Sequence, residues 1–142
     1  MKRRIVIADD DPLIISLIRL RLEMEDFEVF PARNGEEALS LIRGKKPVAA
    51  ILDFQMPRKS GMDVLGAVKA DPDTNKMPVM MLTGERDNDL VMRAMGAGAG
   101  DFILKPFQPD RLLERLNRMV QTSVRMATAA MPRHKSAPVW EL

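Results

Sequence analysis

The sequence predicts a doubly wound α/β domain, with a parallel sheet of five strands and helices on both faces. Short apolar segments alternate five times with amphipathic segments of helical period, which is the pattern of repeated βα units. The short segments are almost continuously apolar, as expected of strands that are buried on both faces. Together these observations indicate parallel strands that are joined by right-handed helical crossovers.

The expected strands are five short runs, each followed by a turn or a helix signal. They are Ile5–Ala8, Glu28–Ala32, Val48–Leu52, Pro78–Leu82 and Phe102–Leu104. The second run contains Pro31, which has no N–H to donate to a neighbouring strand. We therefore expect this strand at an edge of the sheet.

The segments between the strands carry helix start and stop signals. Asp11 before Pro12 is typical of an N-cap followed by proline in the first turn. Asn34 and Glu37 predict a capping box, and Gly44 predicts the C-terminal cap of the same helix. Further helices are expected after the turn Pro57–Gly61, around Asp89–Met95 and from Pro109 onward.

The 142 residues are expected to form a domain over residues 2–120 and a C-terminal helical extension and tail over residues 121–142. The extension holds Arg125, Arg133 and Lys135 against Glu141, which accounts for the whole net charge of +2. The domain itself is electrically balanced, so we expect it to make no direct contact with nucleic acid. The apolar stripe of the last helix continues into the extension, which is either a frayed helix end or a contact helix.

Composition excludes several classes of site. The chain has no cysteine and one histidine, His134, which rules out disulfides, thiol catalysis and multi-histidine metal sites in the main domain. The apolar run after the basic N-terminus, Ile5–Ala8, is too short for a secretory signal, and no run is long enough to cross a membrane. We expect a cytoplasmic protein without membrane contact.

Charged and polar side chains stand where four of the strands end. Asp9 and Asp10 follow the first strand, Asp53 follows the third, Thr83 the fourth and Lys105 the fifth. Ligands of open parallel sheets bind outside the carboxyl ends of the strands, so these side chains are expected in one pocket. Two carboxylates about 4 Å apart repel by roughly 4 kcal/mol at an effective dielectric constant near 20. Three clustered carboxylates therefore need a cation or a proton.

Only oxygen ligands are available in this pocket, which favours a hard ion such as Mg²⁺, with Mn²⁺ as an alternative. Asp10 and Asp53 are the expected direct ligands, and the backbone carbonyl of Gln55 lies within plausible reach. Asp9 is expected to hold a metal-bound water.

The remaining groups suit phosphoryl transfer. The carboxylate of Asp53 is a nucleophile that needs no general base. The hydroxyl of Thr83 and the ammonium of Lys105 can neutralise the oxygens of a phosphoryl group in the transition state.

At these positions the sequence resembles the response-regulator receiver family over about residues 2–120. The resemblance is carried by four strings in the order found in the family: Ile5–Pro12, Ile51–Gly61, Met81–Gly84 and Lys105–Phe107. It implies a flavodoxin-like fold with strand order 2-1-3-4-5. That order places the second strand at an edge, as Pro31 independently requires.

The resemblance also implies a mechanism and partners. A histidine kinase or histidine phosphotransfer protein donates the phosphoryl group to Asp53. Thr83 then moves toward the phosphate, Phe102 turns inward, and the face formed by the fourth helix, fifth strand and fifth helix changes its contacts. Gln55 and Glu85 lie where the family tunes hydrolysis of the phosphoaspartate. Phe102 as plain core, and Gln55 and Glu85 as exposed loop side chains, are equally compatible with the sequence.

We expect a signalling phosphoacceptor, with self-catalysed phosphotransfer and autodephosphorylation only. An Mg²⁺-dependent phosphatase or phosphotransferase needs a second acid two residues after the nucleophile, where this chain has Gln55. A degenerate receiver would lack the acidic residues. A receiver excised from a longer regulator remains an alternative. The output would pass to a downstream protein target, and a homodimer could form through the face just described or through the C-terminal helix.

Overall fold

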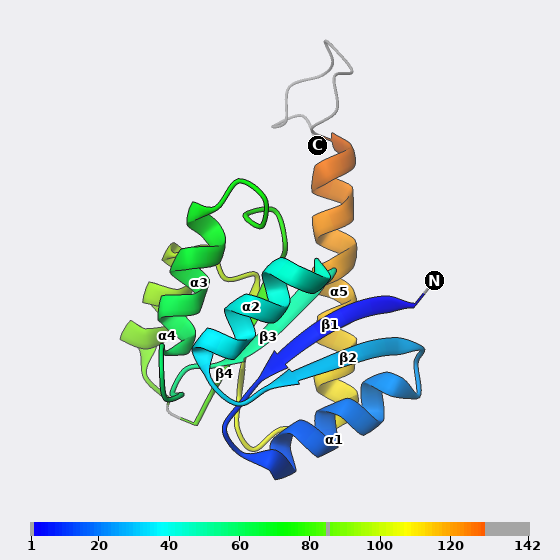
Figure 1. Ribbon diagram of the computed structural model, residues 1–142, viewed down its shortest axis with the longest axis vertical. Helices are drawn as coiled ribbons and strands as arrows, with labels where there is room; N and C mark the ends of the chain where they lie inside the picture. Colours follow the sequence, from blue (N-terminus) through cyan, green and yellow to red (C-terminus); the bar gives the residue numbers. More distant parts are fainter. Residues whose placement is uncertain (1, 85, 130–142) are drawn as a thin grey trace.

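In the computed structural model, which describes residues 2–84 and 86–129, five strands alternate with five helices (Figure 1). The strands are β1 Arg3–Ala8, β2 Phe27–Ala32, β3 Ala49–Asp53, β4 Val79–Thr83 and β5 Asp101–Leu104. The helices are α1 Pro12–Glu23, α2 Gly35–Lys45, α3 Gly61–Ala70, α4 Asn88–Gly96 and α5 Pro109–Ala129.

The strands form one parallel sheet in the order β2-β1-β3-β4-β5. The predicted fold class and strand order are therefore confirmed. Strand β2 lies at an edge, and its Pro31 pairs in register with Ile7 of β1. Proline is tolerated there because the outer side of β2 has no neighbouring strand that needs an N–H donor.

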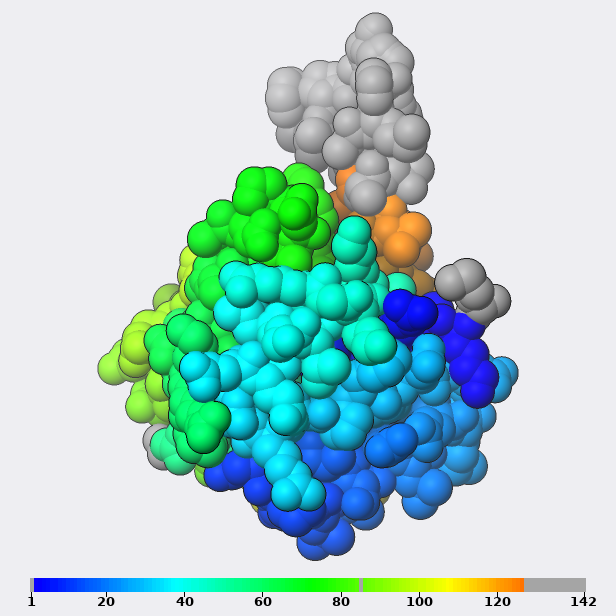
Figure 2. Space-filling view, in the orientation of Figure 1, coloured from blue at the N-terminus to red at the C-terminus, as the bar shows by residue number. Residues whose placement is uncertain are grey.

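The sheet separates two hydrophobic cores. Ile5 and Ile7 of β1 belong to the core under α1 and α5, whereas Val6 and Ala8 belong to the core under α2, α3 and α4. This alternation follows from the two-residue period of a strand, whose successive side chains point to opposite faces. Figure 2 shows α2, in cyan, on one outer face of the molecule. Because both faces are covered, the strands can be apolar throughout.

The helix starts are set by side-chain caps, and one of them differs from the prediction. Asp11 caps α1 as expected, accepting a hydrogen bond from the N–H of Leu13 at 2.9 Å. Asn34 caps α2, but the carboxylate of Glu37 accepts from the N–H of Arg33 rather than from that of Asn34, so the predicted box is not closed. A complete capping box instead opens α3, where Ser60 and Asp63 bond each other's backbone N–H groups.

The predicted cap at Gly44 is wrong. Helix α2 continues through Lys45, and Lys46 takes the left-handed conformation with φ of 50°. The N–H of Lys46 still donates to the carbonyl of Ile42 at 3.1 Å. Pro47 follows, and it has no N–H to continue the helix and disfavours a helical conformation at the residue before it. The helix therefore ends at Lys45 with Lys46 as its cap, although Gly44 has the stronger intrinsic preference for a cap.

Helix α5 is continuous through Ala129 and passes the expected division at residues 120 and 121 without a break. Figure 1 shows its last turns, in orange, projecting beyond the end of the sheet. The division into two parts therefore stays a prediction, and the tail from residue 130 onward lies outside the described residues. Among the described residues, no helix combines the length and apolar character needed to cross a membrane.

A glycine joins the end of β3 to the start of α3. A Cβ at Gly61 would overlap the backbone carbonyl oxygen of Asp53 and approach Met81 Cε to 3.0 Å. The N–H of Gly61 donates to the carbonyl of Phe54 at 3.0 Å, which holds the loop in this close position. The backbone of Asp53 is thus fixed by contact with the first residue of α3.

We predict that Gly61→Ala lowers the free energy of unfolding by about 1–3 kcal/mol, because the added methyl must displace backbone. Gly66→Ala in the same helix is the matched control. Apart from its own helix backbone and chain neighbours, no described atom lies within 4 Å of a Cβ at Gly66, so that change should raise stability by about 0.5–1 kcal/mol. Urea denaturation of both variants measures the difference. Equal stability of Gly61→Ala and the parent chain would contradict the close contact.

Candidate functional site

Four neighbouring strands bring polar side chains to the carboxyl edge of the sheet. Asp53 and Thr83 are the last residues of β3 and β4, whereas Asp9 and Lys105 directly follow β1 and β5. The strand register pairs Ala8 with Leu52, Asp53 with Leu82 and Thr83 with Leu104, so the strands end at nearly the same level. Their common direction therefore determines the position of the cluster.

Three carboxylates meet at this edge. Asp9, Asp10 and Asp53 each offer an oxygen, and these oxygens all lie within 4.8 Å of one another. Asp9 is fully buried and Asp53 is 7% exposed, while Asp10 is exposed. The structure thus brings the three predicted acids together, two of them in surroundings that screen charge poorly.

Lys105 provides the positive charge inside the cluster. Its Nζ lies 2.7 Å from Asp9 Oδ2 and 3.4 Å from Asp53 Oδ1. The contact with Asp9 Oδ2 is a short ion pair with a fully buried carboxylate. Asp9 is oriented from its other oxygen, which accepts the N–H of Asp11 at 2.9 Å. The buried Asp9 carboxylate is therefore balanced by the charge of Lys105.

The pKa values follow from this crowding. Burial, and then the charge of Asp9, raise the pKa of Asp53 to about 6, although Lys105 opposes the shift. Burial alone would lower the pKa of Lys105, but Asp9 and Asp53 outweigh it and the net pKa is raised. At neutral pH Asp53 is thus largely ionised and Lys105 is charged, which is the state that a nucleophile and its electrostatic partner require.

The other predicted residues lie around this cluster. Thr83 is buried, and its backbone carbonyl accepts the N–H of Lys105 at 2.7 Å, which ties the ends of β4 and β5 together. Gln55 is exposed in the loop after β3. Phe102 is half-buried and packs against the core under α2, α3 and α4. Glu85 lies outside the described residues. The roles of these four side chains stay predictions.

The peptide bond between Lys105 and Pro106 is cis. It lies directly after β5, where the chain turns away from the sheet toward α5. Cis bonds are tolerable there because the following residue is proline.

The loop from β3 to α3 contains positioning residues that were not identified from the sequence. Arg58 and Lys59 take positive φ angles of 52° and 86°, which L-residues rarely adopt. The loop is held by α2, because the N–H of Gly35 donates to Pro57 O at 3.3 Å and that of Glu36 to Arg58 O at 3.0 Å. A Cβ at Gly35 would overlap the backbone of Lys59. In the sequence, the one sign of this close contact is the glycine at position 35, directly after the Asn34 cap.

The arrangement has the groups needed for transfer of an anionic group to a carboxylate. The buried carboxylate of Asp53 has the chemistry of a nucleophile, and Lys105 lies close enough to neutralise charge that develops beside it. The three carboxylate oxygens also form a donor set that suits a hard divalent cation.

Comparison with known proteins gives a consistent result. The family described as "Response regulator receiver domain" matches residues 5–117. The DNA-binding response regulator MtrA of Mycolicibacterium smegmatis is 33% identical over 116 residues, which is 82% of this chain and 50% of MtrA. The phosphate regulon transcriptional regulatory protein PhoB of Pseudomonas aeruginosa is 34% identical over 84% of this chain and 52% of PhoB. The chain spans about half the length of the curated relatives it matches.

Solved structures give the same result. The chemotaxis response regulator CheY4 of Vibrio cholerae superposes with a TM-score of 0.79 and 28% identity, covering 84% of this chain and 99% of that one. NtrX from Brucella abortus superposes with a TM-score of 0.85 and 30% identity, covering 94% of this chain and 30% of NtrX.

We predict that Asp53→Asn raises the free energy of unfolding at pH 7 by about 1–3 kcal/mol in buffer free of divalent cations. The folded-state pKa of Asp53 lies above its ordinary value of 3.8. Ionisation of Asp53 therefore lowers the free energy of unfolding as the pH rises from about 4 through 6. Asparagine does not ionise, so the variant keeps the stability that the parent chain loses. Urea denaturation at pH 7 and at pH 4 measures the difference, which should shrink at the lower pH.

The control for this experiment is Asp73→Asn, at an exposed aspartate far from the cluster. It should change stability by less than about 0.5 kcal/mol at both pH values. A stability gain of Asp53→Asn that is the same at pH 4 and pH 7 would contradict the raised pKa.

Proposed function

Because the chain belongs to the response regulator receiver domain family, we propose that Asp53 is its phosphoacceptor and that the donor is a phosphohistidine of a histidine kinase or histidine phosphotransfer protein. The observation that carries the assignment is the position of Lys105, whose Nζ lies 3.4 Å from Asp53 Oδ1. Receiver domains of two-component systems are signalling phosphoacceptors, and the cluster contains the nucleophile and the cation that this activity needs.

In the proposed reaction a carboxylate oxygen of Asp53 forms a bond to phosphorus. The bond between phosphorus and the donor imidazole nitrogen breaks, and the imidazole leaves with its electron pair. Lys105 and the hydroxyl of Thr83 neutralise the phosphoryl oxygens as charge accumulates on them. No general base is required because Asp53 is already ionised at neutral pH, its pKa being about 6. The same groups would support slow self-catalysed hydrolysis of the phosphoaspartate, tuned by Gln55 and Glu85.

The residues that would hold Mg²⁺ are Asp10 and Asp53 as direct ligands, the backbone carbonyl of Gln55, and Asp9 through a water. Support comes from the three carboxylate oxygens within 4.8 Å of one another, and Mn²⁺ fits the same donor set. When bound, the ion supplies positive charge that offsets the repulsion between these acids and the incoming phosphate. Asp10 is exposed and can therefore be reached from solvent.

The output of phosphorylation would be a change in the face of α4, β5 and α5, with Thr83 and Phe102 as the switch residues. Two exposed apolar side chains on α4 support a contact role for this face, Met92 at 72% and Met95 at 46% exposure. Phe102 is only half-buried and lacks a hydroxyl, so packing alone would decide its position. A downstream protein, or a second copy that binds through this face or through α5, would read the change.

The relatives constrain how far this proposal extends. MtrA is described as DNA-binding, whereas the domain expected over residues 2–120 is electrically balanced. We therefore assign no direct nucleic-acid contact to this domain and leave the receiver of a longer regulator as the alternative context. A cytoplasmic location, where receiver domains generally function, is part of the proposal.

We predict that acetyl phosphate with Mg²⁺ adds one phosphoryl group to the chain and that Asp53→Asn abolishes the addition. Acetyl phosphate serves as a small donor, because the receiver supplies the catalytic groups itself. Intact-mass spectrometry measures the uptake. Normal uptake by Asp53→Asn would reject Asp53 as the acceptor, whereas Asp73→Asn should react like the parent chain.

The same reaction tests the metal ligands. Asp10→Asn should raise the Mg²⁺ concentration needed for half-maximal uptake by about tenfold or more, because one ligand charge is lost. Asp11→Asn is a close control, since asparagine still caps α1 and Asp11 is not proposed as a ligand. Equal Mg²⁺ dependence of the two variants would contradict the proposed donor set.

A further inference from the structure

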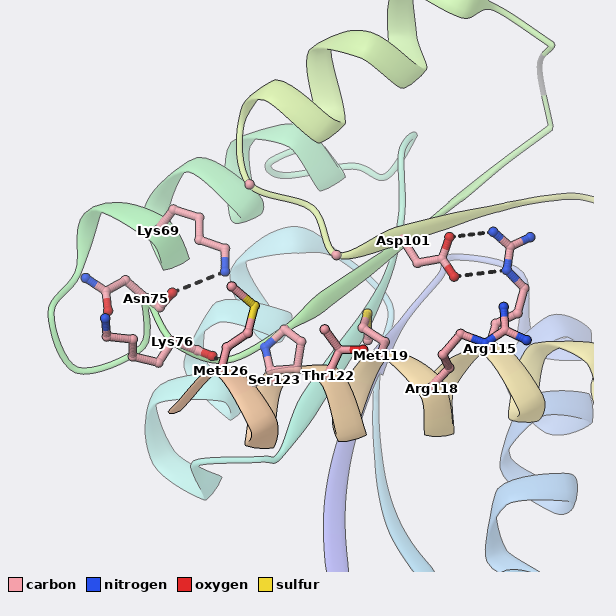
Figure 3. Close-up of a pocket in the computed structure, with 13 residues that line it drawn as sticks. Lys69, Asn75, Lys76, Asp101, Arg115, Arg118, Met119, Thr122, Ser123 and Met126 are labelled. Atoms are coloured by element: carbon pink, nitrogen blue, oxygen red, sulfur yellow. Dashed lines mark hydrogen bonds and ion pairs between the residues drawn. The ribbon is translucent and has the colours of Figure 1, made fainter. Parts of the chain in front are cut away.

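A cavity of about 760 Å³ lies at the opposite end of the sheet from the carboxylates. It is lined by the turn before β4, the start of β5 and the projecting half of α5 (Figure 3). The side chains and backbone of the following residues form its walls: Lys69, Asn75, Lys76, Pro78, Gly98, Gly100, Asp101, Arg115, Arg118, Met119, Thr122, Ser123 and Met126. Five of these, from Arg118 to Met126, lie beyond the family match, which ends at residue 117.

The interior of the cavity is mainly apolar and is kept open by glycine. Met119 is buried, and Met126 is 68% exposed although it lies on the cavity wall. Gly100 has no side chain to fill the space, and a Cβ there would come within 2.9 Å of Met119 Sδ. Gly98 has φ of 106° and packs against the stem of Lys69. An apolar ligand body would therefore cover surface that is now open to water.

The charges around the cavity do not balance. Four basic side chains and one acidic side chain line it. The acid, Asp101, is already paired with Arg115 through two hydrogen bonds of 2.9 and 2.5 Å, which Figure 3 shows as dashed lines. Lys69, Lys76 and Arg118 therefore remain as the positive groups. In the described part of the chain, Arg118 has one acidic partner, the exposed Glu114 at 3.8 Å. The cavity is complementary to an anion.

Lys69 is positioned to receive that anion. Its Nζ donates to the carbonyls of Asn75 at 3.2 Å and Met77 at 3.0 Å, which fix the ammonium at the cavity wall. An ammonium has three hydrogens, and within residues 2–84 and 86–129 no acceptor is recorded for the third. Burial also lowers the pKa of Lys69, so an anion beside it would restore stabilisation that the charged form lacks.

We propose that this cavity binds a small amphipathic organic acid, in which a carboxylate is attached to an aromatic or medium-length alkyl body. The carboxylate accepts from Lys69, and Arg118 adds positive charge at the other end of the lining, while the body lies against Met119 and Met126. The volume is in the range of small-molecule sites, which are typically about 300–1,000 Å³. The site is separate from the phosphoacceptor cluster, and its occupation would bear on α5 and the start of β5.

The test uses the full chain and 4-phenylbutyrate as probe, with uncharged 4-phenylbutanol as the matched control. In a ¹H–¹⁵N NMR titration we expect amide shifts confined to the cavity residues, including Gly98, Gly100 and Thr122. The expected dissociation constant is about 1 mM or tighter for a probe of this size. The alcohol should bind at least about fivefold more weakly, because it lacks the charge. Equal binding of the alcohol, or no localised shifts, would overturn the proposal.

Variants give a second readout. Lys69→Met should lower the affinity for 4-phenylbutyrate by about tenfold, since a charge-assisted hydrogen bond is lost. Lys69→Met also removes two hydrogen bonds to backbone carbonyls, so a second variant is needed that changes only an exposed side chain. Arg118→Gln is that variant, and it should lower the affinity for the probe by about twofold to fivefold. Arg111→Gln, on the same helix but outside the cavity, should leave the affinity unchanged.

Equal affinity in the parent chain, Lys69→Met and Arg118→Gln would overturn the proposal, as would an equal loss in Arg111→Gln. The proposal would also be overturned if the NMR signals of the cavity residues shifted with protein concentration but not with added probe. Such shifts would identify the cavity as a contact between copies of the chain.

Discussion

The mutual repulsion of three carboxylates, offset by one ammonium, is the interaction on which the rest of the site depends. Asp9, Asp10 and Asp53 approach within 4.8 Å, and Lys105 is the cation that the structure places among them. One positive charge cannot balance three negative ones, so the folded state retains unfavourable electrostatic energy at neutral pH. In the proposed function, a bound cation relieves this energy and a phosphoryl group redistributes the charge, so that occupancy of the site would be coupled to the conformation around it.

The fold imposes this crowding and prevents its relaxation. The parallel register brings the ends of β1, β3, β4 and β5 to one edge. Asp9 is fixed by the N–H of Asp11, and the backbone of Asp53 is fixed by its contact with Gly61. The loop after Asp53 is in turn held by the first residues of α2. Repulsive groups remain together because two hydrophobic cores and several backbone contacts stabilise the sheet that carries them.

Much of this architecture could be predicted from the sequence, because strands buried on both faces and polar strand ends leave a strong pattern. Pro31 alone placed β2 at an edge, and the position of Asp53 after an apolar run placed it in the cluster. Local helix ends were less predictable. Gly44 has the stronger intrinsic preference for a C-cap, but Lys46 before Pro47 takes that role. The position of the cap is decided by Pro47, which prevents the helix from continuing, and not by the intrinsic preference of Gly44.

Features that depend on packing between distant segments were not accessible from the sequence. The left-handed Arg58 and Lys59 have no favourable local signal, because the stabilising bonds come from α2. The cavity beside α5 forms only when Lys69, Gly98 and Met126 meet from three separate elements. The proposed switch roles of Thr83 and Phe102 concern a second conformation, which neither a sequence pattern nor one structure describes.

The central claim is best tested by the titration of the Asp53 carboxyl carbon, followed by NMR against pH in the absence of divalent cations. We expect a midpoint near 6 in the parent chain, as burial and Asp9 require. We expect a higher midpoint in Lys105→Met, because the cation that opposes the shift is removed. A midpoint close to 3.8, or one that does not respond to the loss of Lys105, would show that the three carboxylates and the lysine do not form a coupled cluster.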